Sequence, residues 1–229
     1  NSRVVWLRGP RLSISNPVSL WIIKDKYLTK KVLSELKIPF PEGSPAKTLP
    51  EALKIAKKIG FPLVIKPRSF EGGKGVFLNV TSLKKVKDFF PKSLRYDNDV
   101  LLEKEVFGTY YRITMVDYAI AGILETRGIS LIGNGKNTVR ELIRELNTKK
   151  KVGSFYKITT KTNDILSFQN LSLESVPKIK RSFILGFSGA EGGDWIDRTD
   201  EICKENKKLL SDLTRYLDLR VVGIDLIAM

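Results

Sequence analysis

The chain has 229 residues, of which 42% are hydrophobic and 28% charged, and this composition suits a folded protein of one large domain or two small ones. No apolar run approaches the roughly 20 residues that are needed to cross a bilayer. The absence of histidine and the single cysteine exclude Ser-His-Asp and Cys-His triads, histidine metal sites and an internal disulfide, and they fit a cytoplasmic location. A net charge of +15 would suit nucleic acid, but the lysines are spread along expected helix faces and no strand carries paired aromatics, so we expect the charge to solvate the surface and attract an anionic nucleotide.

The first half of the chain is expected to alternate helices and strands. Residues 1–23 are interpreted as a short segment with two turns, followed by a helix over about 24–37. Thr48 and Glu51 form a capping-box pattern, which predicts a helix that ends at Gly60. The next expected elements are a strand at 61–66, a glycine-rich turn at 68–75, a strand at 76–80, a helix at 82–90 and a strand at 100–106.

The second half continues the alternation, with hairpins between the helices. Strands are expected at 111–116 and 119–125, and a second capping box, Thr138 to Glu141, predicts a helix to about 147. Residues 148–180 show no clear pattern. A strand at 183–187, a loop at 188–194, a helix at 200–217 and a strand at 221–228 complete the chain. This order predicts an α+β fold with mixed sheets.

The glycine-rich turn carries the first chemical signal. Its glycines allow backbone N–H groups to point into one concavity, which favours an anion, and Lys66 stands at the end of the preceding apolar strand, where its amine can reach a phosphate. The Walker pattern is absent. Taken alone, the turn fits a glycine-rich hairpin with a surface lysine better than an anion-binding loop.

Five motifs occur in order along residues 19–229. The first is Asp25-Lys26 with Thr29-Lys30 and Pro-Phe-Pro-Glu-Gly at 39–43; the second is Gly-Phe-Pro-Leu-Val-Ile-Lys-Pro at 60–67; the third is Leu-Glu-Lys-Glu-Val-Phe-Gly at 102–108 with Tyr111-Arg112. The fourth runs from Arg127 through 133–135 and 138–143 to Asn147, and the fifth joins residues within 188–201 to Val-Gly-Ile-Asp at 222–225. The series resembles the ATP-grasp superfamily, in particular the cyanophycin synthetase-like and bifunctional glutathione synthetase-like carboxylate–amine ligases.

The resemblance implies an ATP-grasp fold, in which two α+β lobes hold ATP between them. Residues 1–28 would be a leading segment from a preceding region, 29–104 the small lobe with its glycine-rich lid, and 105–229 the large lobe. Residues that match the family's nucleotide-binding positions are the phosphate lysines Lys26 and Lys66, the lid residues Gly72, Gly73, Lys74 and Gly75, and the adenine hinge Glu103, Lys104 and Val106.

The resemblance also implies roles at the reacting centre. Arg112 and Arg127 match family arginines there, where either could stabilise an acyl phosphate or bind a substrate carboxylate. Asp225 matches a Mg2+ ligand, although an edge-strand residue that faces water is the alternative. The family's next metal ligands are expected beyond Met229, so the chain as written could bind nucleotide and yet be inactive as a ligase.

The implied function is an ATP-dependent carboxylate–amine ligase that forms amide or peptide bonds through an acyl phosphate. It would use ATP and Mg2+, with a small acid and an amine of amino-acid or peptide type as substrates. A non-catalytic ATP-binding module and a basic nucleic-acid-binding protein are the alternatives. The sequence names neither the acid nor the amine, and it leaves a homo-oligomer and a further C-terminal domain open.

Overall fold

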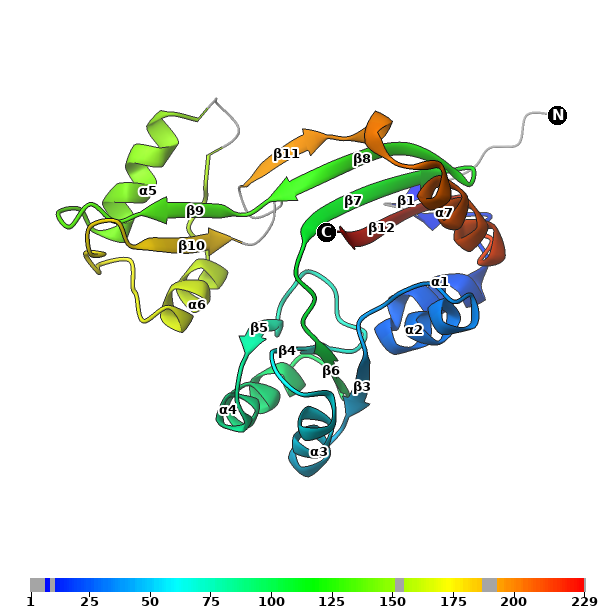
Figure 1. Ribbon diagram of the computed structural model, residues 1–229, viewed down its shortest axis with the longest axis horizontal. Coiled ribbons are helices and arrows are strands. Elements are labelled where there is room, and N and C mark those ends of the chain that lie inside the picture. Colours follow the sequence, from blue (N-terminus) through cyan, green and yellow to red (C-terminus); the bar gives the residue numbers. More distant parts are fainter. Residues whose placement is uncertain (1–6, 9–10, 151–154, 187–192, 229) are drawn as a thin grey trace. The chain divides into compact units, whose positions relative to one another are not determined.

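The computed structural model describes residues 7, 8, 11–150, 155–186 and 193–228 (Figure 1). Helices alternate with strands, which confirms the α+β class. The chain divides into two compact units: unit 1 is Asn1–Phe107, Thr114–Ile120 and Ile202–Gly223, and unit 2 is Gly108–Ile113, Ala121–Glu201 and Ile224–Met229. The lobe boundaries at 29–104 and 105–229 stay a prediction.

The described part of unit 1 begins with the short strands β1 (Leu7–Arg8) and β2 (Arg11–Leu12), and two successive helices follow them. The first helix, α1 (Pro17–Lys24), contradicts the expected two-turn segment at 1–23. Asn16-Pro17 resembles a turn, but the Asn16 side chain accepts a hydrogen bond from the Val18 N–H at 2.9 Å, and Pro17 takes the first helical position, where its missing N–H costs nothing. The second helix, α2 (Lys26–Glu35), was predicted, and Asp25 caps it.

The central sheet of unit 1 has the strand order β3-β6-β4-β5 (Figure 1). Alternate side chains of its strands face α3 and α4, where Leu63, Ile65 and Leu102 join the helix residues Ala56 and Phe90 in one buried core. The other face of the sheet therefore carries the intervening side chains, including Lys66 and Glu103. The elements are β3 (Gly43–Ala46), α3 (Leu49–Ile59), β4 (Leu63–Pro67), β5 (Phe77–Val80), α4 (Leu83–Leu94) and β6 (Val100–Lys104).

The helix ends of unit 1 follow the sequence signals closely. The predicted capping box is present, since Thr48 Oγ1 accepts from the Glu51 N–H and the Glu51 carboxylate accepts from the Thr48 N–H, and Gly60 ends α3 with a φ of 77°. Helix α4 continues four residues beyond the predicted end at Phe90, through Pro91. The last helix of the unit, α7 (Lys204–Tyr216), starts later than predicted because a 3-10 turn occupies Thr199–Glu201.

A second four-stranded sheet has the order β11-β8-β7-β12, so β12 is an edge strand. Its strands are β7 (Thr109–Val116), β8 (Ala119–Arg127), β11 (Asp194–Asp197) and β12 (Val221–Ala228). Strand β11 was not predicted, because Asp194 was assigned to a loop at 188–194. Residues 187–192 of that expected loop, with the motif residues Ser188, Gly189 and Gly192, lie outside the described residues.

A smaller subdomain of unit 2 packs two helices with an antiparallel pair of strands around Phe183 and Leu185. Its elements are β9 (Ile129–Ile132), α5 (Val139–Thr148), α6 (Thr160–Phe168) and β10 (Ser182–Gly186). Helix α6 was missed because its capping box uses Thr159 with Thr162 where the usual pattern has Glu or Gln. Within the described ranges, no helix is long and apolar enough to span a membrane.

Candidate functional site

Glu103 lies at the centre of a charge cluster on the open face of the unit 1 sheet. It is paired in register with Val64 of β4, so Lys66, two residues further along, is its diagonal neighbour on the same face. Lys66 Nζ forms an ion pair with Glu103 Oε1, and Lys30 Nζ of α2 lies 2.8 Å from Oε2. Strand β3 approaches this position so closely that a Cβ on Gly43 would lie 2.6 Å from the Glu103 Cβ. Backbone packing therefore fixes the carboxylate between two lysines.

Burial and charge act in opposite directions on this cluster. The Glu103 side chain is 7% exposed, and burial by itself raises the pKa of its carboxyl, but Lys66 and Lys30 outweigh this and hold the pKa below its usual value. Burial lowers the pKa of Lys30, although Glu103 opposes the shift. Lys30 Nζ also donates to the Pro41 carbonyl at 2.6 Å. The carboxylate is thus ionised and lies between two lysines.

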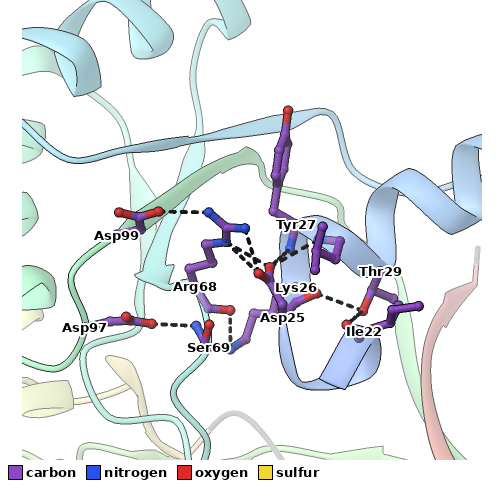
Figure 2. Close-up of polar contacts among 10 residues, drawn as sticks. Ile22, Asp25, Lys26, Tyr27, Thr29, Arg68, Ser69, Asp97 and Asp99 are labelled. Carbon is purple, nitrogen blue, oxygen red and sulfur yellow. Dashed lines mark hydrogen bonds and ion pairs between the residues drawn. The ribbon is translucent and has the colours of Figure 1, made fainter. Parts of the chain in front are cut away.

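Lys26 joins the same cluster from one helical turn before Lys30. Its Nζ reaches the Arg68 carbonyl at 3.3 Å (Figure 2). It also donates to the Phe70 carbonyl at 2.8 Å, and both carbonyls stand at the base of the glycine-rich turn. Burial lowers the pKa of Lys26, and the charge of Lys66 is the next largest cause. The two lysines predicted to hold phosphates are therefore close enough to repel each other, as residues that share one polyanion would be.

An arginine between two aspartates fastens the start of α2 to the glycine-rich turn (Figure 2). Asp25 caps α2 by accepting from the Tyr27 and Leu28 N–H groups, and it also binds Arg68, whose Nη2 lies 2.7 Å from Oδ2. Arg68 Nη1 lies 2.8 Å from Asp99 Oδ2. Burial opposes ionisation of Asp25, but its bonds to Arg68 and to the helix N–H groups hold its pKa below the usual value. The ion pairs of Arg68 with Asp25 and Asp99 were not predicted from the sequence.

The glycine-rich turn itself adopts a conformation that depends on glycine. Gly72 and Gly73 have φ angles of 81° and 72°, in the left-handed region. Gly75 has a φ of 71°, and a Cβ there would lie 2.6 Å from the Tyr96 ring, which also contacts Phe70. Lys74, at the same turn, is exposed. The turn therefore depends on glycine at these positions, and its binding of an anion stays a prediction.

The predicted adenine hinge begins with the last two residues of β6, Glu103 and Lys104, and continues to Val106. The Lys104 N–H donates to the Glu42 carbonyl at 2.7 Å, and Lys104 Nζ donates to the Phe61 carbonyl at 2.6 Å. The Val106 side chain is 42% exposed. The Glu103 carboxylate is engaged by lysines, so any contact of Glu103 with adenine would compete with these ion pairs. The adenine role of all three residues stays a prediction.

Two predicted residues of unit 2 form an ion pair. Arg112 of β7 and Asp225 of β12 lie 2.7 Å apart between Nη1 and Oδ1, and their side chains are 42% and 53% exposed. Burial and the neighbouring Asp225 together raise the pKa of Tyr110. Asp225 thus lies on an edge strand with an exposed side chain, and no group of three potential metal ligands occurs among the residues described. The role of Asp225 as a Mg2+ ligand stays a prediction. An exposed single carboxylate still fits Mg2+, which protein sites often hold with one or two carboxylates, phosphates and water.

Arg127, at the end of β8, is paired with a buried neighbour. Its Nε lies 2.5 Å from Glu125 Oε1, while Arg198 Nε lies 2.9 Å from Oε2 of the same carboxylate. These two arginines hold the pKa of Glu125 below its usual value. Sequence reasoning named Arg127 but neither Glu125 nor Arg198.

Fold and sequence comparisons define the class of protein. The family described as "Carbamoyl-phosphate synthase L chain, ATP binding domain" matches residues 25–111, which contain the whole lysine cluster. The fold is similar to D-alanine–D-alanine ligase from Bacillus anthracis, with a TM-score of 0.59 and 17% identity, over 94% of this chain and 56% of that one. Residues 25–111 thus match a family of ATP-binding domains, and the chain has the fold of ATP-grasp ligases, which confirms the resemblance found in its motifs.

Two relatives with named activities are much longer than this chain. The chain is 30% identical over 234 residues to the glutathione biosynthesis bifunctional protein GshAB of Listeria monocytogenes, and the match covers 96% of this chain and 30% of the relative. It is 29% identical over 213 residues to cyanophycin synthetase of a Nostoc species, and that match covers 89% of this chain and 24% of the relative. The chain therefore spans less than a third of the length of these curated relatives.

Proposed function

We propose that the chain is the ATP-binding and carboxylate-activating part of a cytoplasmic carboxylate–amine ligase. The observation that carries this proposal is the gathering of Lys30 and Lys66 at Glu103 and of Lys26 at the base of the glycine-rich turn, inside the segment that matches an ATP-binding domain. Three ammonium groups around one carboxylate leave positive charge available for a polyphosphate. The relatives named as glutathione and cyanophycin biosynthesis proteins favour an amino-acid or peptide-like acid as substrate.

The proposed reaction has two steps. A carboxylate oxygen of the acid attacks the γ-phosphorus of ATP, the bond to the ADP oxygen breaks, and an acyl phosphate forms. The amine then attacks the acyl carbon, phosphate leaves, and the amine proton passes to solvent. Lys26 and Lys66 would neutralise charge on the phosphates, and the turn at 68–75 would supply N–H donors. Arg112 and Arg127 would bind the oxyanions of the acid or acyl phosphate.

Asp225 is the residue that would hold Mg2+, which when bound neutralises phosphate charge. Its present partner is Arg112, so a cation at Asp225 would replace one positive group with another. Because the pair is exposed on both sides, this exchange requires little desolvation.

Nucleotide binding tests the first half of the proposal. Isothermal titration with a non-hydrolysable ATP analogue should give at least tenfold weaker binding for Lys26→Met and Lys66→Met than for wild type. Lys57→Met on the exposed face of α3 is the matched control and should bind like wild type. Unchanged affinity in both site variants would remove the lysine cluster from the nucleotide site.

Trapping of the acyl phosphate tests the second half. The chain is incubated with ATP, Mg2+, hydroxylamine and a panel of amino acids and dipeptides, and hydroxamate and ADP are measured. Equal amounts of both, dependent on one acid, are expected. Nucleotide binding without hydroxamate from any acid would favour a non-catalytic ATP-binding module, whereas salt-sensitive binding of nucleic acid that ATP does not affect would favour a nucleic-acid-binding protein.

A further inference from the structure

Glu125 is a buried carboxylate in unit 2 that the proposed reaction does not use. Its side chain is 7% exposed, and it accepts one guanidinium on each oxygen, from Arg127 and from Arg198. Glu125 and Arg127 are two residues apart in β8, so both side chains leave the same face of the sheet. Arg198 follows β11, in which Ile196 is paired with Glu125, so Arg198 is a diagonal neighbour on that face.

The two arginines are bound in different ways. Arg198 is held at both ends, because its Nε binds Glu125 and its Nη1 lies 2.7 Å from Glu201. Its backbone N–H also donates to the Ile123 carbonyl at 2.8 Å. The Arg198 side chain is thus bound by two carboxylates of the protein, and it fixes the Glu125 carboxylate in one orientation.

Arg127 is bound through Nε alone. Its side chain is 57% exposed, and neither Nη group has a hydrogen bond to a residue in the described ranges. An exposed arginine samples many rotamers, and fixing it in one of them costs conformational entropy. The bond to a rigid buried carboxylate removes much of this freedom before a ligand arrives, while the two Nη groups stay available as a forked donor.

We propose that Glu125 is a positioning residue that holds Arg127 ready to receive an oxyanion through its Nη groups. This inference rests on the proposed ligase function, in which that oxyanion is the carboxylate of the acid or the phosphoryl group of the acyl phosphate. Arg198 is the support that keeps Glu125 in place. Glu125 itself touches no substrate.

Arginine side-chain NMR on the intact chain tests the arrangement directly. The Arg127 Nε–Hε signal, assigned with Arg127→Lys, should be observable and protected from solvent exchange in wild type and lost in Glu125→Gln. Arg198→Lys should weaken it. Glu174→Gln, which breaks the exposed Arg140–Glu174 pair of the same unit, is the matched control and should leave the Arg127 signal unchanged.

Two anion titrations then separate positioning from a purely structural role. Acetate represents the substrate carboxylate and inorganic phosphate represents the phosphoryl group, and the Arg127 signals should shift saturably with one of them. Glu125→Gln should weaken that anion about fivefold or more, and Glu174→Gln should not. If Glu125→Gln loses the Arg127 signal but keeps the anion affinity of wild type, Glu125 has only a structural role. If the wild-type Arg127 signals respond to neither anion, Arg127 does not bind the oxyanion.

Binding of the ATP analogue to the same samples separates this inference from the proposed function. Glu125→Gln should bind the analogue like wild type, which also shows that the variant is folded. If wild type binds no nucleotide while the Arg127 result holds, the ligase proposal fails and the positioning of Arg127 stands. If wild type and Glu125→Gln both bind the analogue and Glu125→Gln keeps full anion affinity, the positioning role of Glu125 fails and the ligase proposal stands.

Discussion

Glu103 in unit 1 and Asp225 in unit 2 are both carboxylates of predicted site strands, yet they meet their counter-charges in opposite ways. Glu103 is almost fully buried between two lysines, and Gly43 packs against it. Asp225 lies on an edge strand, is 53% exposed, and pairs with one arginine that is itself exposed. The matched ATP-binding segment contains the first carboxylate and not the second.

The difference separates a carboxylate that must stay paired from one that can change partners. If a buried carboxylate loses its two ammonium partners, its charge stays uncompensated in a poorly solvated site, which is strongly unfavourable. An exposed pair is screened by water and contributes little, so its partner can be exchanged for another cation. Glu103 is therefore suited to hold lysines in position, and Asp225 is suited to bind a transient ion.

The largest expected effect is that of Glu103→Gln on the stability of the unit 1 sheet. The substitution leaves Lys30 and Lys66 without a counter-charge, and we expect a loss of about 2 to 3 kcal/mol, since both lysines are only partly able to reach water. Hydrogen exchange of the β4 and β6 amides should become about 30- to 150-fold faster.

Glu174→Gln is the control for this experiment, because it removes a carboxylate from an ion pair that is 39% and 68% exposed. Its effect on the amides of α5 should stay within about 1 kcal/mol. Equal effects of the two substitutions would contradict the distinction between buried and exposed carboxylates. A Lys30→Met, Glu103→Met double variant should recover part of the lost stability.

The pH dependence of unfolding is expected to show a smaller effect with a defined sign. The pKa of Glu103 in the folded chain lies below its usual value of about 4.5, and that of Asp25 is lowered as well. A carboxyl with a lowered folded pKa contributes stability that is complete above the unfolded pKa and is lost as the pH falls through the folded pKa. Urea midpoints measured from pH 6 down to pH 3 should decline below about pH 4.5, and Glu103→Gln should flatten the decline. An equally steep decline in that variant would assign the pH dependence to other carboxyls.

Local patterns account for what could be predicted from sequence. The Thr48 and Thr138 capping boxes, the stop at Gly60 and the apolar strand that ends at Lys66 are each determined within a few residues. Helix α1 was missed because Asn16-Pro17 begins a turn or a helix with equal ease, and only the hydrogen bond to the Val18 N–H decides between them. The sequence thus predicted most elements and the lysines that stand in motifs.

The partners of those lysines and arginines could not be predicted in the same way. Arg68 meets Asp25 across 43 positions, and Arg198 meets Glu125 across 73. Each meeting depends on sheet register or on a helix end packed against a turn, which no single motif encodes. Glu103 illustrates the consequence, because its motif indicated an adenine contact while its register with Val64 brings Lys66 beside it.

The smallest effect on stability is expected for Asp225→Asn, and it sharpens the comparison most. Because the Arg112 pair is exposed, the hydrogen exchange of β12 should change by no more than about 1 kcal/mol. Titration of the ATP analogue with and without Mg2+ should nevertheless show that the Mg2+-dependent part of the affinity falls in Asp225→Asn and persists in Glu174→Gln. If Asp225→Asn destabilises β12 as strongly as Glu103→Gln destabilises β4, and the Mg2+ dependence is unchanged, Asp225 is a structural residue. A stable variant that no longer responds to Mg2+ assigns to Asp225 a role that only an exposed, exchangeable carboxylate can fill.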